Sequence, residues 1–320
     1  LENEPVWGGL AAGFEVLPGI FLEKFYHHWF TNDTDVLALC RELGLYSSLN
    51  FLPSKTSIYT QGKIFPFDGP LSVLKFSPLN FLERVRFGLV TLILKVMSNS
   101  LMMERQTAVS FIKKWYGQTG FRVVWEPLLK GKFANFYDSI SLTWFWARIK
   151  KRTLRLVYPK GGFQVLVDGL VEKIKSLGGN LAKGVPIESI KQTETGAWQI
   201  TFDGRVQEFN YLVVTSSIKT FIKLFPNLPE DYKRRIDSIK YINAQILILV
   251  LKNSLTDFYW VNINEKEFPF LALVEQTNFM KTQDYGDYRV VYLGNYLPDG
   301  DARLAMSEER LINLYEPYLK

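Results

Sequence analysis

Five apolar residues recur at helical spacing early in the chain: Val36, Leu37, Leu39, Cys40 and Leu43. Asn32 or Asp33 precedes them as a candidate N-cap, and Gly44 follows as a stop signal. This combination predicts a helix that buries one face. Because Cys40 lies on that face, the simplest interpretation makes it a core residue.

Short β-like pieces flank this helix. Residues 20–26 follow a turn at Pro18-Gly19 and have strand character. Residues 57–59 and 63–67 surround a Gln61-Gly62 turn, which predicts a hairpin.

Residues 71–155 are helical in pattern. From Phe81 to Met97, apolar side chains cover nearly the whole circumference, and Arg84, Arg86 and Lys95 leave only a thin polar face. A helix of this kind is usually buried and sometimes lies on a membrane. We therefore expect burial and keep peripheral membrane contact through this stretch as the alternative.

At Tyr158 the pattern changes to a turn at Gly161-Gly162, an amphipathic helix over 165–177, and three strands within 180–215. The run from Tyr211 to Thr215 is apolar throughout, as in a strand buried on both faces of a parallel sheet. Residues 241–252, 271–275 and 288–296 are predicted to share another sheet, and 306–319 to form a terminal helix.

The predicted fold class is therefore α/β plus α+β, in two interleaved domains. Residues 1–55 and 156–225 are expected to form a partial Rossmann-like domain. Residues 56–155 and 226–320 are expected to form a domain of mixed sheet and helices.

Composition narrows the class of protein. With 47% hydrophobic residues the chain should fold into a packed core. One cysteine excludes an internal disulfide framework, which favours the cytoplasm. The net charge is +6, concentrated between Arg148 and Lys160, but no nucleic-acid-binding module accompanies it. We interpret that segment as a solvated helix end and expect no nucleic-acid partner.

The first residues carry half of a dinucleotide-binding pattern. In a βαβ unit, a carboxylate at the end of the second strand binds the ribose, about 20 residues after a glycine-rich phosphate turn. Glu2 fits the carboxylate and is followed by Gly8-Gly9, but the 320 residues contain no such turn before it. We expect the turn to lie upstream of Leu1.

Together these motifs resemble the flavin-containing amine oxidase superfamily, which includes protoporphyrinogen oxidase and phytoene desaturase, and especially its protoporphyrinogen-oxidase-like branch. The matching stretches are Glu2 with Gly8-Gly9-Leu10-Ala11, Leu22-Glu23-Lys24-Phe25-Tyr26-His27-His28, Glu42-Leu43-Gly44-Leu45, Trp125-Glu126-Pro127-Leu128-Leu129-Lys130-Gly131-Lys132-Phe133, Trp146-Ala147-Arg148-Ile149 and Gly161-Gly162.

The resemblance implies FAD as the cofactor. It implies that Glu2 holds the adenosine ribose, that Gly8, Gly9 and Leu10 form a turn beside the pyrophosphate, and that the Val185 backbone meets the adenine. The strand ending at Thr215 would return the chain to the FAD sheet, so that 1–55 and 156–225 form the FAD-binding domain and the rest binds substrate. A closing FAD segment is expected beyond Lys320, and the 320 residues alone are expected to bind FAD weakly or not at all and to be inactive.

In such enzymes the flavin accepts a hydride, and the protein supplies orientation and a dry environment. The only histidines, His27 and His28, follow a segment that in the superfamily runs close to the flavin, which makes them the candidates for acid-base catalysis. The alternative is that both are structural. Metal binding by this pair is disfavoured, because adjacent side chains diverge.

Aromatic residues are the candidates for walls of a substrate pocket, and this composition suits an apolar, conjugated or isoprenoid-like small molecule better than a small polar amine. They are Trp125, Trp144, Trp146, Tyr259, Trp260, Tyr292 and Tyr296. Two alternatives share the superfamily fold. One is a flavin-dependent isomerase of the UDP-galactopyranose mutase type, and the other is a non-enzymatic binding protein like the Rab GDP-dissociation inhibitors.

Overall fold

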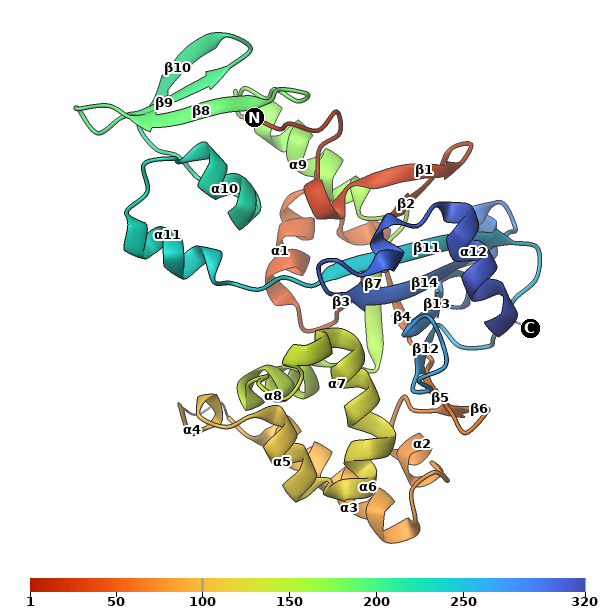
Figure 1. The fold of residues 1–320 in the computed structure, drawn as a ribbon. Coiled ribbons are helices and arrows are strands. Elements are labelled where there is room, and N and C mark those ends of the chain that lie inside the picture. The colour runs from red at the N-terminus through yellow and green to blue at the C-terminus, as the bar shows by residue number, and fades with distance from the viewer. Residues whose placement is uncertain (99–100, 320) are drawn as a thin grey trace. The chain divides into compact units, whose positions relative to one another are not determined.

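A computed structural model of the protein describes residues 1–98 and 101–319 (Figure 1). The chain divides into two compact units. The smaller contains Leu1–Ala12 and Leu166–Tyr241, and the larger contains Gly13–Val165 and everything from Ile242 onward. Residues 13–55 therefore pack with the larger unit. The assignment of cofactor and substrate binding to separate domains stays a prediction.

A six-stranded mixed sheet forms the centre of the larger unit, in the order β11-β14-β13-β12-β5-β6. Its strands are β5 (Thr56–Thr60), β6 (Lys63–Pro66), β11 (Asn243–Leu251), β12 (Trp260–Ile263), β13 (Ala272–Glu275) and β14 (Arg289–Leu297). The predicted hairpin is present as β5 and β6, and the three predicted sheet partners are present as β11, β13 and β14. Only β12 and β5 pair in parallel within this sheet, with Trp260 opposite Thr56.

Smaller β elements and one helix complete the β part of this unit. A hairpin joins β1 (Gly13–Leu17) to β2 (Ile20–Glu23), and a three-stranded sheet has the order β3-β7-β4, with β3 at Trp29–Phe30, β4 at Leu49–Pro53 and β7 at Arg155–Pro159. Helix α1 (Thr34–Glu42) begins after Asp33 and is followed by Gly44 at φ +71°, as predicted. Cys40 is buried in the core.

Helices dominate residues 70–151, also as predicted, and they pack around the buried Phe87, Leu94, Tyr116 and Phe145. Their bounds are α2 Pro70–Leu74, α3 Phe81–Val96, α4 Leu101–Glu104, α5 Ala108–Trp115, α6 Gly117–Gly120, a π-helical turn at Phe121–Trp125, α7 Glu126–Phe133 and α8 Leu142–Lys151. Near the C-terminus, α12 covers Glu308–Tyr315, and Ser307 caps it by accepting a hydrogen bond from Arg310 N.

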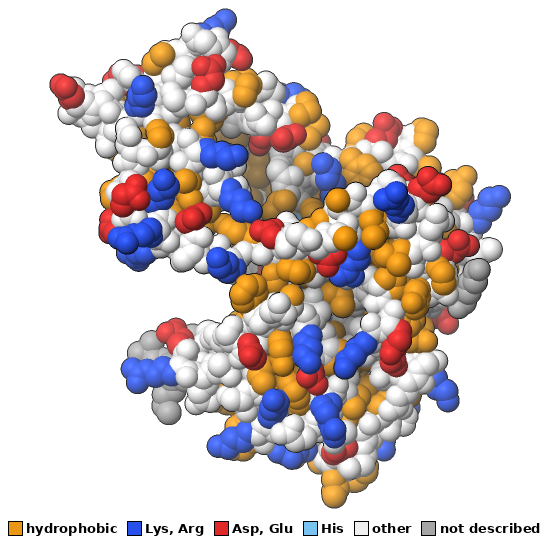
Figure 2. Space-filling view, viewed as in Figure 1, with side chains coloured by type: hydrophobic (Ala, Val, Ile, Leu, Met, Phe, Trp, Pro, Cys, Tyr) orange, Lys and Arg blue, Asp and Glu red, His pale blue; other side chains and the backbone are white. Residues whose placement is uncertain are grey.

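The expected burial of the 81–97 helix is wrong for half of its surface. Phe87, Val90 and Leu94 face the core of the helical layer, but Leu82 is 77% exposed and Val96 70% exposed, and Leu89 and Leu92 are also exposed. Helical spacing explains the difference. A helix that packs against neighbours on one side buries only the residues of that side, and the residues of the opposite side stay exposed. In Figure 2, hydrophobic and basic side chains lie side by side over this helical part, at the bottom of the view. Within the described ranges, no helix has the length and apolar character that a transmembrane span requires.

The smaller unit contains an antiparallel meander and three helices. Its elements are α9 (Gln164–Ser176, which begins in the larger unit), β8 (Ile187–Gln192), β9 (Trp198–Phe202), β10 (Arg205–Phe209), α10 (Ile218–Leu224) and α11 (Glu230–Asp237). The predicted buried strand ending at Thr215 is wrong, since β10 ends at Phe209 and Tyr211 and Val213 are 91% and 85% exposed. A strand buried on both faces needs a paired neighbour, and no described residue pairs with 210–217. The Rossmann-like parallel sheet stays a prediction.

Candidate functional site

Two segments of the smaller unit, far apart in sequence, bring Glu2 and Val185 together. The Val185 amide donates a hydrogen bond to the Glu2 carbonyl at 3.0 Å, and the Glu2 amide donates to Ala182 O at 2.9 Å. One carboxylate oxygen of Glu2 accepts from the Glu4 amide at 2.9 Å. The two residues predicted to meet the adenosine are thus direct neighbours, although their role in cofactor binding stays a prediction.

The glycine doublet adopts backbone conformations that side chains rarely allow. Gly8 has φ +120° and Gly9 has φ +54°. A Cβ on Gly8 would lie 3.0 Å from Val167 Cγ2 and 3.1 Å from Ala12 N, whereas nothing lies within 4 Å of one on Gly9. The turn is therefore crowded at Gly8 and open at Gly9, where a phosphate could approach the main chain. This geometry is compatible with binding of the pyrophosphate part of FAD. Leu10 follows in the same turn and is exposed.

Thr215 is not joined to this group. It lies exposed between β10 and α10, in a stretch without regular secondary structure. In the part of the chain that the structure describes, no hydrogen bond links it to Glu2, Gly8 or Val185.

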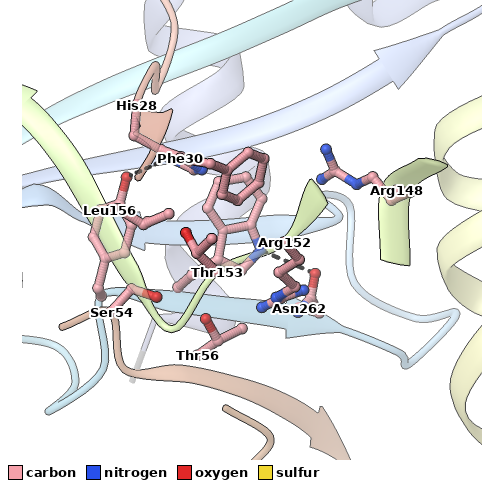
Figure 3. A pocket seen from close by; sticks show the side chains of 11 residues that line it. His28, Phe30, Ser54, Thr56, Arg148, Arg152, Thr153, Leu156 and Asn262 are labelled. Atoms are coloured by element: carbon pink, nitrogen blue, oxygen red, sulfur yellow. Dashed lines mark hydrogen bonds between the residues drawn. The ribbon is translucent and has the colours of Figure 1, made fainter. Parts of the chain in front are cut away.

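In the larger unit, His28 lines a small polar cavity of about 60 Å³ (Figure 3). Its Nδ1 lies 3.0 Å from the Tyr259 hydroxyl. Burial, followed by the charges of Arg148 and Arg152 and by His27, lowers the pKa of His28 to about 3. The imidazole is therefore neutral at physiological pH.

His27 points elsewhere. Its ring centroid lies 5.6 Å from that of Phe163, and burial lowers its pKa. It does not line the cavity that holds His28. The histidine pair is therefore divided between two environments, as expected for adjacent residues of an extended chain.

A second, mainly apolar cavity of about 160 Å³ adjoins the first and shares Thr56, Trp260 and Asn262 with it. Of the aromatic residues predicted to wall a pocket, Trp125, Trp144, Trp260 and Tyr296 line this cavity, and Tyr259 lines the polar one.

Trp146 and Tyr292 line neither cavity. Trp146 donates to Met97 O at 3.2 Å, and Tyr292 is buried and donates to Glu23 O at 3.2 Å.

Three cations at this site were not predicted as site residues. Arg148, on α8, and Arg152, which follows it, line both cavities, and Lys132 on α7 lines the apolar one. Figure 3 shows Arg148 and Arg152 among the side chains around the polar cavity. The basic run is exposed to solvent, as predicted, but Arg148 and Arg152 also line the cavities. The signal for a site is the spacing, because Trp144 and Arg148 lie four residues apart on one side of α8 and Arg152 follows four residues later, just after the helix ends.

Lys132 and two tyrosines interact at the wall of the apolar cavity. Lys132 Nζ lies 4.2 Å from the ring centroid of Tyr296. Burial alone would raise the pKa of the Tyr296 hydroxyl, but the positive charge of Lys132 and a hydrogen bond with Tyr26 lower that pKa overall. Burial raises the pKa of the Tyr26 hydroxyl. Tyr296 is thus the more acidic of the two hydroxyls.

Glu23 is a buried carboxyl that the sequence did not single out as a site. The Tyr158 hydroxyl donates to its Oε2 at 2.7 Å, and the Phe163 amide donates to Oε1. Burial raises the pKa of Glu23 despite these bonds. The carboxyl holds the Gly161-Gly162 turn against β2, and a Cβ on Gly162 would lie 2.8 Å from Glu23 Oε1.

Solved structures of two oxidoreductases and of a mutase have a similar fold. A candidate protoporphyrinogen oxidase from Exiguobacterium sp. 255-15 superposes with a TM-score of 0.76 at 16% identity, covering 99% of this chain and 75% of that one. An oxidoreductase from Methanosarcina mazei gives 0.75 at 15% identity, with coverage of 98% and 76%. Reduced UDP-galactopyranose mutase gives 0.71 at 16% identity, with coverage of 98% and 70%.

The sequence has no match among curated proteins. The sequence model described as "Flavin containing amine oxidoreductase" matches residues 1–320, which is the whole chain. The chain therefore belongs to the family of flavin-containing amine oxidoreductases.

Proposed function

We propose that the protein is an FAD-dependent oxidoreductase that removes a hydride from a substrate with a largely apolar body. The observation that carries this proposal is the cavity of about 160 Å³ walled by Trp125, Trp144, Trp260 and Tyr296. A pocket of this character with few polar groups is typical of small-molecule sites.

FAD would be held at its adenosine end by the smaller unit. The Glu2 carboxylate would bind the ribose, the Gly8-Gly9 turn would receive the pyrophosphate, and Val185 would contact the adenine. Leu10 and Thr215 are proposed as further neighbours. When bound, the flavin supplies the hydride acceptor, so the protein needs no nucleophile of its own.

The larger unit's residues would orient the substrate and exclude water. The edge-to-face pair of Tyr26 and Trp260, with ring centroids 4.8 Å apart, gives the cavity a rigid wall. The Trp260 indole donates to Asn262 Oδ1 at 2.9 Å, which fixes the ring further. A preformed wall positions a substrate at low entropic cost.

The histidines have separate proposed roles. Because its pKa is depressed to about 3, His28 would act as a neutral hydrogen-bonding group together with Tyr259. His27 would be the better proton acceptor, since its pKa lies closer to neutral pH.

A flavin-dependent isomerase of the UDP-galactopyranose mutase type is the second candidate. Arg148 and Arg152 at the cavity favour it, because such an enzyme must bind a diphosphate. A non-enzymatic binding protein of this fold is the third.

The exposed face of α3 supports a peripheral membrane contact. Its arginines already bind carbonyl groups: Arg84 donates to Leu74 O at 2.8 Å, and Arg86 donates to Lys114 O and Trp115 O, both at 2.6 Å. The apolar residues Leu82, Leu89, Leu92 and Val96 of α3 are exposed, and an exposed apolar stripe of this kind is typical of an interfacial helix.

The visible spectrum of the purified intact protein tests the enzymatic proposals. We expect flavin absorption that bleaches anaerobically when a substrate is added. Conversion of a substrate only after the flavin has been reduced chemically, with no net oxidation of that substrate, would favour the isomerase. A colourless protein would contradict both enzymatic functions and leave the binding protein.

A further inference from the structure

The two cavities contain three cations and no carboxylate. Lys132, Arg148 and Arg152 line them, and neither lining includes an aspartate or a glutamate. In the described ranges, none of the three cations forms an ion pair. Lys130, two residues from Lys132, shows the contrast, because it binds Glu126 at 2.7 Å outside the cavities.

The positive charge affects two titratable groups beside it. Arg148 and Arg152 help to lower the pKa of His28, and Lys132 and Arg148 help to lower that of Tyr296. Asp68 influences Arg152 but forms no ion pair with it and lines neither cavity. Arg148 and Arg152 are also exposed to solvent, so an anionic ligand can reach them and replace water as their hydrogen-bonding partner.

The apolar wall beside these cations is built from rigid rings. Trp125 stacks on Phe87 with a centroid distance of 5.6 Å and an interplanar angle of 5°, and it meets Phe145 edge to face at 4.8 Å. On another wall, Tyr26 meets Trp260 edge to face. Such rings leave space for a flat body, and the nearby arginines would repel a cationic ligand.

We propose that the two cavities together bind a molecule with a flat apolar body and an anionic group, either a carboxylate or a phosphate, and that they reject amines. This inference rests on the proposed function, since it names the substrate class of the same site. The apolar body would lie among Trp125, Trp144 and Trp260. The anion would lie beside Arg148, Arg152 and Lys132, where planar guanidinium groups can form paired hydrogen bonds.

Four naphthalene probes that differ only in their polar group test the proposal on the intact protein by isothermal titration calorimetry. They are 2-naphthoate, 2-naphthyl phosphate, 2-naphthylmethanol and 2-naphthylmethylamine. We expect at least one anion to bind about tenfold or more tightly than the alcohol, because charge-assisted bonds to a guanidinium are strong. The amine should bind more weakly than the alcohol. The tighter of the two anions identifies the group.

Variants assign the effect to the cations. Arg148→Gln and, independently, Lys132→Gln should weaken the favoured anion about tenfold and leave the alcohol unchanged. Lys130→Gln and Lys151→Gln are matched controls on the same two helices and should change neither probe. Unchanged alcohol binding also shows that a variant is folded.

Equal binding of the four probes, tighter binding of the amine, or an anion affinity that survives both cavity variants would overturn the proposal. The titration has no redox readout, so its failure is separate from failure of the proposed function. Anion selection by a colourless protein would support this inference while contradicting the enzyme. Flavin bleaching without anion selection would support the enzyme and contradict this inference.

Discussion

The Tyr26 ring lies directly against the backbone of Gly294. A Cβ on Gly294 would lie 2.6 Å from both Oη and Cε1 of Tyr26. Gly294 belongs to β14, where it is opposite Ile246 of β11 and Ala272 of β13. Tyr26 can therefore occupy its position in the cavity wall only because residue 294 has no side chain.

Gly294→Ala should displace Tyr26 into the apolar cavity. We expect about tenfold weaker binding of the naphthalene probes and a loss of about 2 kcal/mol in the free energy of unfolding, as in other overpacked cores. Calorimetry and urea denaturation measure the two effects.

Gly88→Ala is the matched control for the added methyl group, because nothing lies within 4 Å of a Cβ there. In the interior of α3 it should stabilise the protein by about 0.5–1 kcal/mol and leave probe binding unchanged. Wild-type probe affinity in Gly294→Ala would contradict the steric argument.

Glu23→Ala should destabilise the larger unit more than most single substitutions. The Tyr158 hydroxyl and the Phe163 amide would lose their buried acceptor, at a cost of about 3 kcal/mol. Glu23→Gln keeps an acceptor and should cost about 1 kcal/mol. Urea denaturation compares the two variants, and equal losses would show that the hydrogen bonds are not the cause.

The same carboxyl gives stability a pH dependence. Burial raises the pKa of Glu23 in the folded state, so the folded protein holds the proton more tightly than the unfolded chain. This contribution is fully present below the unfolded pKa and is lost as pH rises through the folded pKa. The free energy of unfolding of Glu23→Gln, relative to that of wild type, should therefore be higher at pH 7 than at pH 4. Urea denaturation at both pH values measures this difference.

His28 should remain neutral in mildly acidic solution. Its pKa is lowered to about 3, so its imidazole NMR signals should not titrate between pH 8 and pH 5. His27, which lacks the same arginine neighbours among the causes of its shift, should titrate at higher pH. Arg148→Gln should raise the pKa of His28 and leave that of His27 nearly unchanged.

This shift has the opposite consequence for stability. The unfolded chain binds a proton at His28 near pH 6.5 and the folded protein does not, so the contribution is present above that pH and is lost as pH falls. Replacing His28 by Gln should reduce the loss of stability between pH 6.5 and pH 4 in thermal unfolding. If the variant loses as much stability as wild type between pH 6.5 and pH 4, groups other than His28 cause the loss.

The exposed face of α3 should bind lipid surfaces. We expect the intact protein to sediment with vesicles of phosphatidylcholine and phosphatidylglycerol, and Leu82→Gln combined with Leu89→Gln to reduce the bound fraction severalfold. Leu154→Gln is the control, because Leu154 is similarly exposed outside α3. Equal loss with the control variant would show that the α3 face is not the contact.

Glu2 should contribute to FAD affinity in the intact protein. Glu2→Gln removes the charge from a hydrogen bond to the ribose and should weaken FAD about tenfold or more. Glu4→Gln, two residues away, is the matched control. Val185→Ala should have little effect, because the main chain of Val185 is the proposed contact. Fluorescence of released flavin measures all three.

Local signals in the sequence predicted local structure well. Helix α3 begins at the predicted boundary because Asn80 accepts from Glu83 N at 2.9 Å and Glu83 accepts from Asn80 N at 2.9 Å, a capping interaction among neighbours in the chain. Glu2 and Gly8-Gly9 were selected in the same way, through a short motif, and their role in cofactor binding stays a prediction.

The arrangement of the cavity could not be predicted, because it depends on distant segments. Whether Trp144 or Trp146 lines it depends on which way α8 faces, and helical spacing alone does not choose between them. The run from Tyr211 to Thr215 shows the same limit, because its apolar pattern predicted burial that only a paired neighbour could provide. Whether Arg148 lines the cavity depends in the same way on the direction in which α8 faces.

The parallel pairing of β5 with β12 has a consequence for how the protein is made. It joins Thr56 to Trp260, roughly 200 residues apart, and both line the cavity. Contacts of such long sequence separation form slowly, and at about 5–20 residues per second the ribosome needs on the order of 10 s to proceed from α8 to β12. During that interval the apolar walls contributed by α7 and α8 have no sheet to cover them. We therefore expect the nascent chain to bind chaperones during that interval, and synthesis that stalls between the two segments should yield aggregates instead of a soluble, partly folded chain.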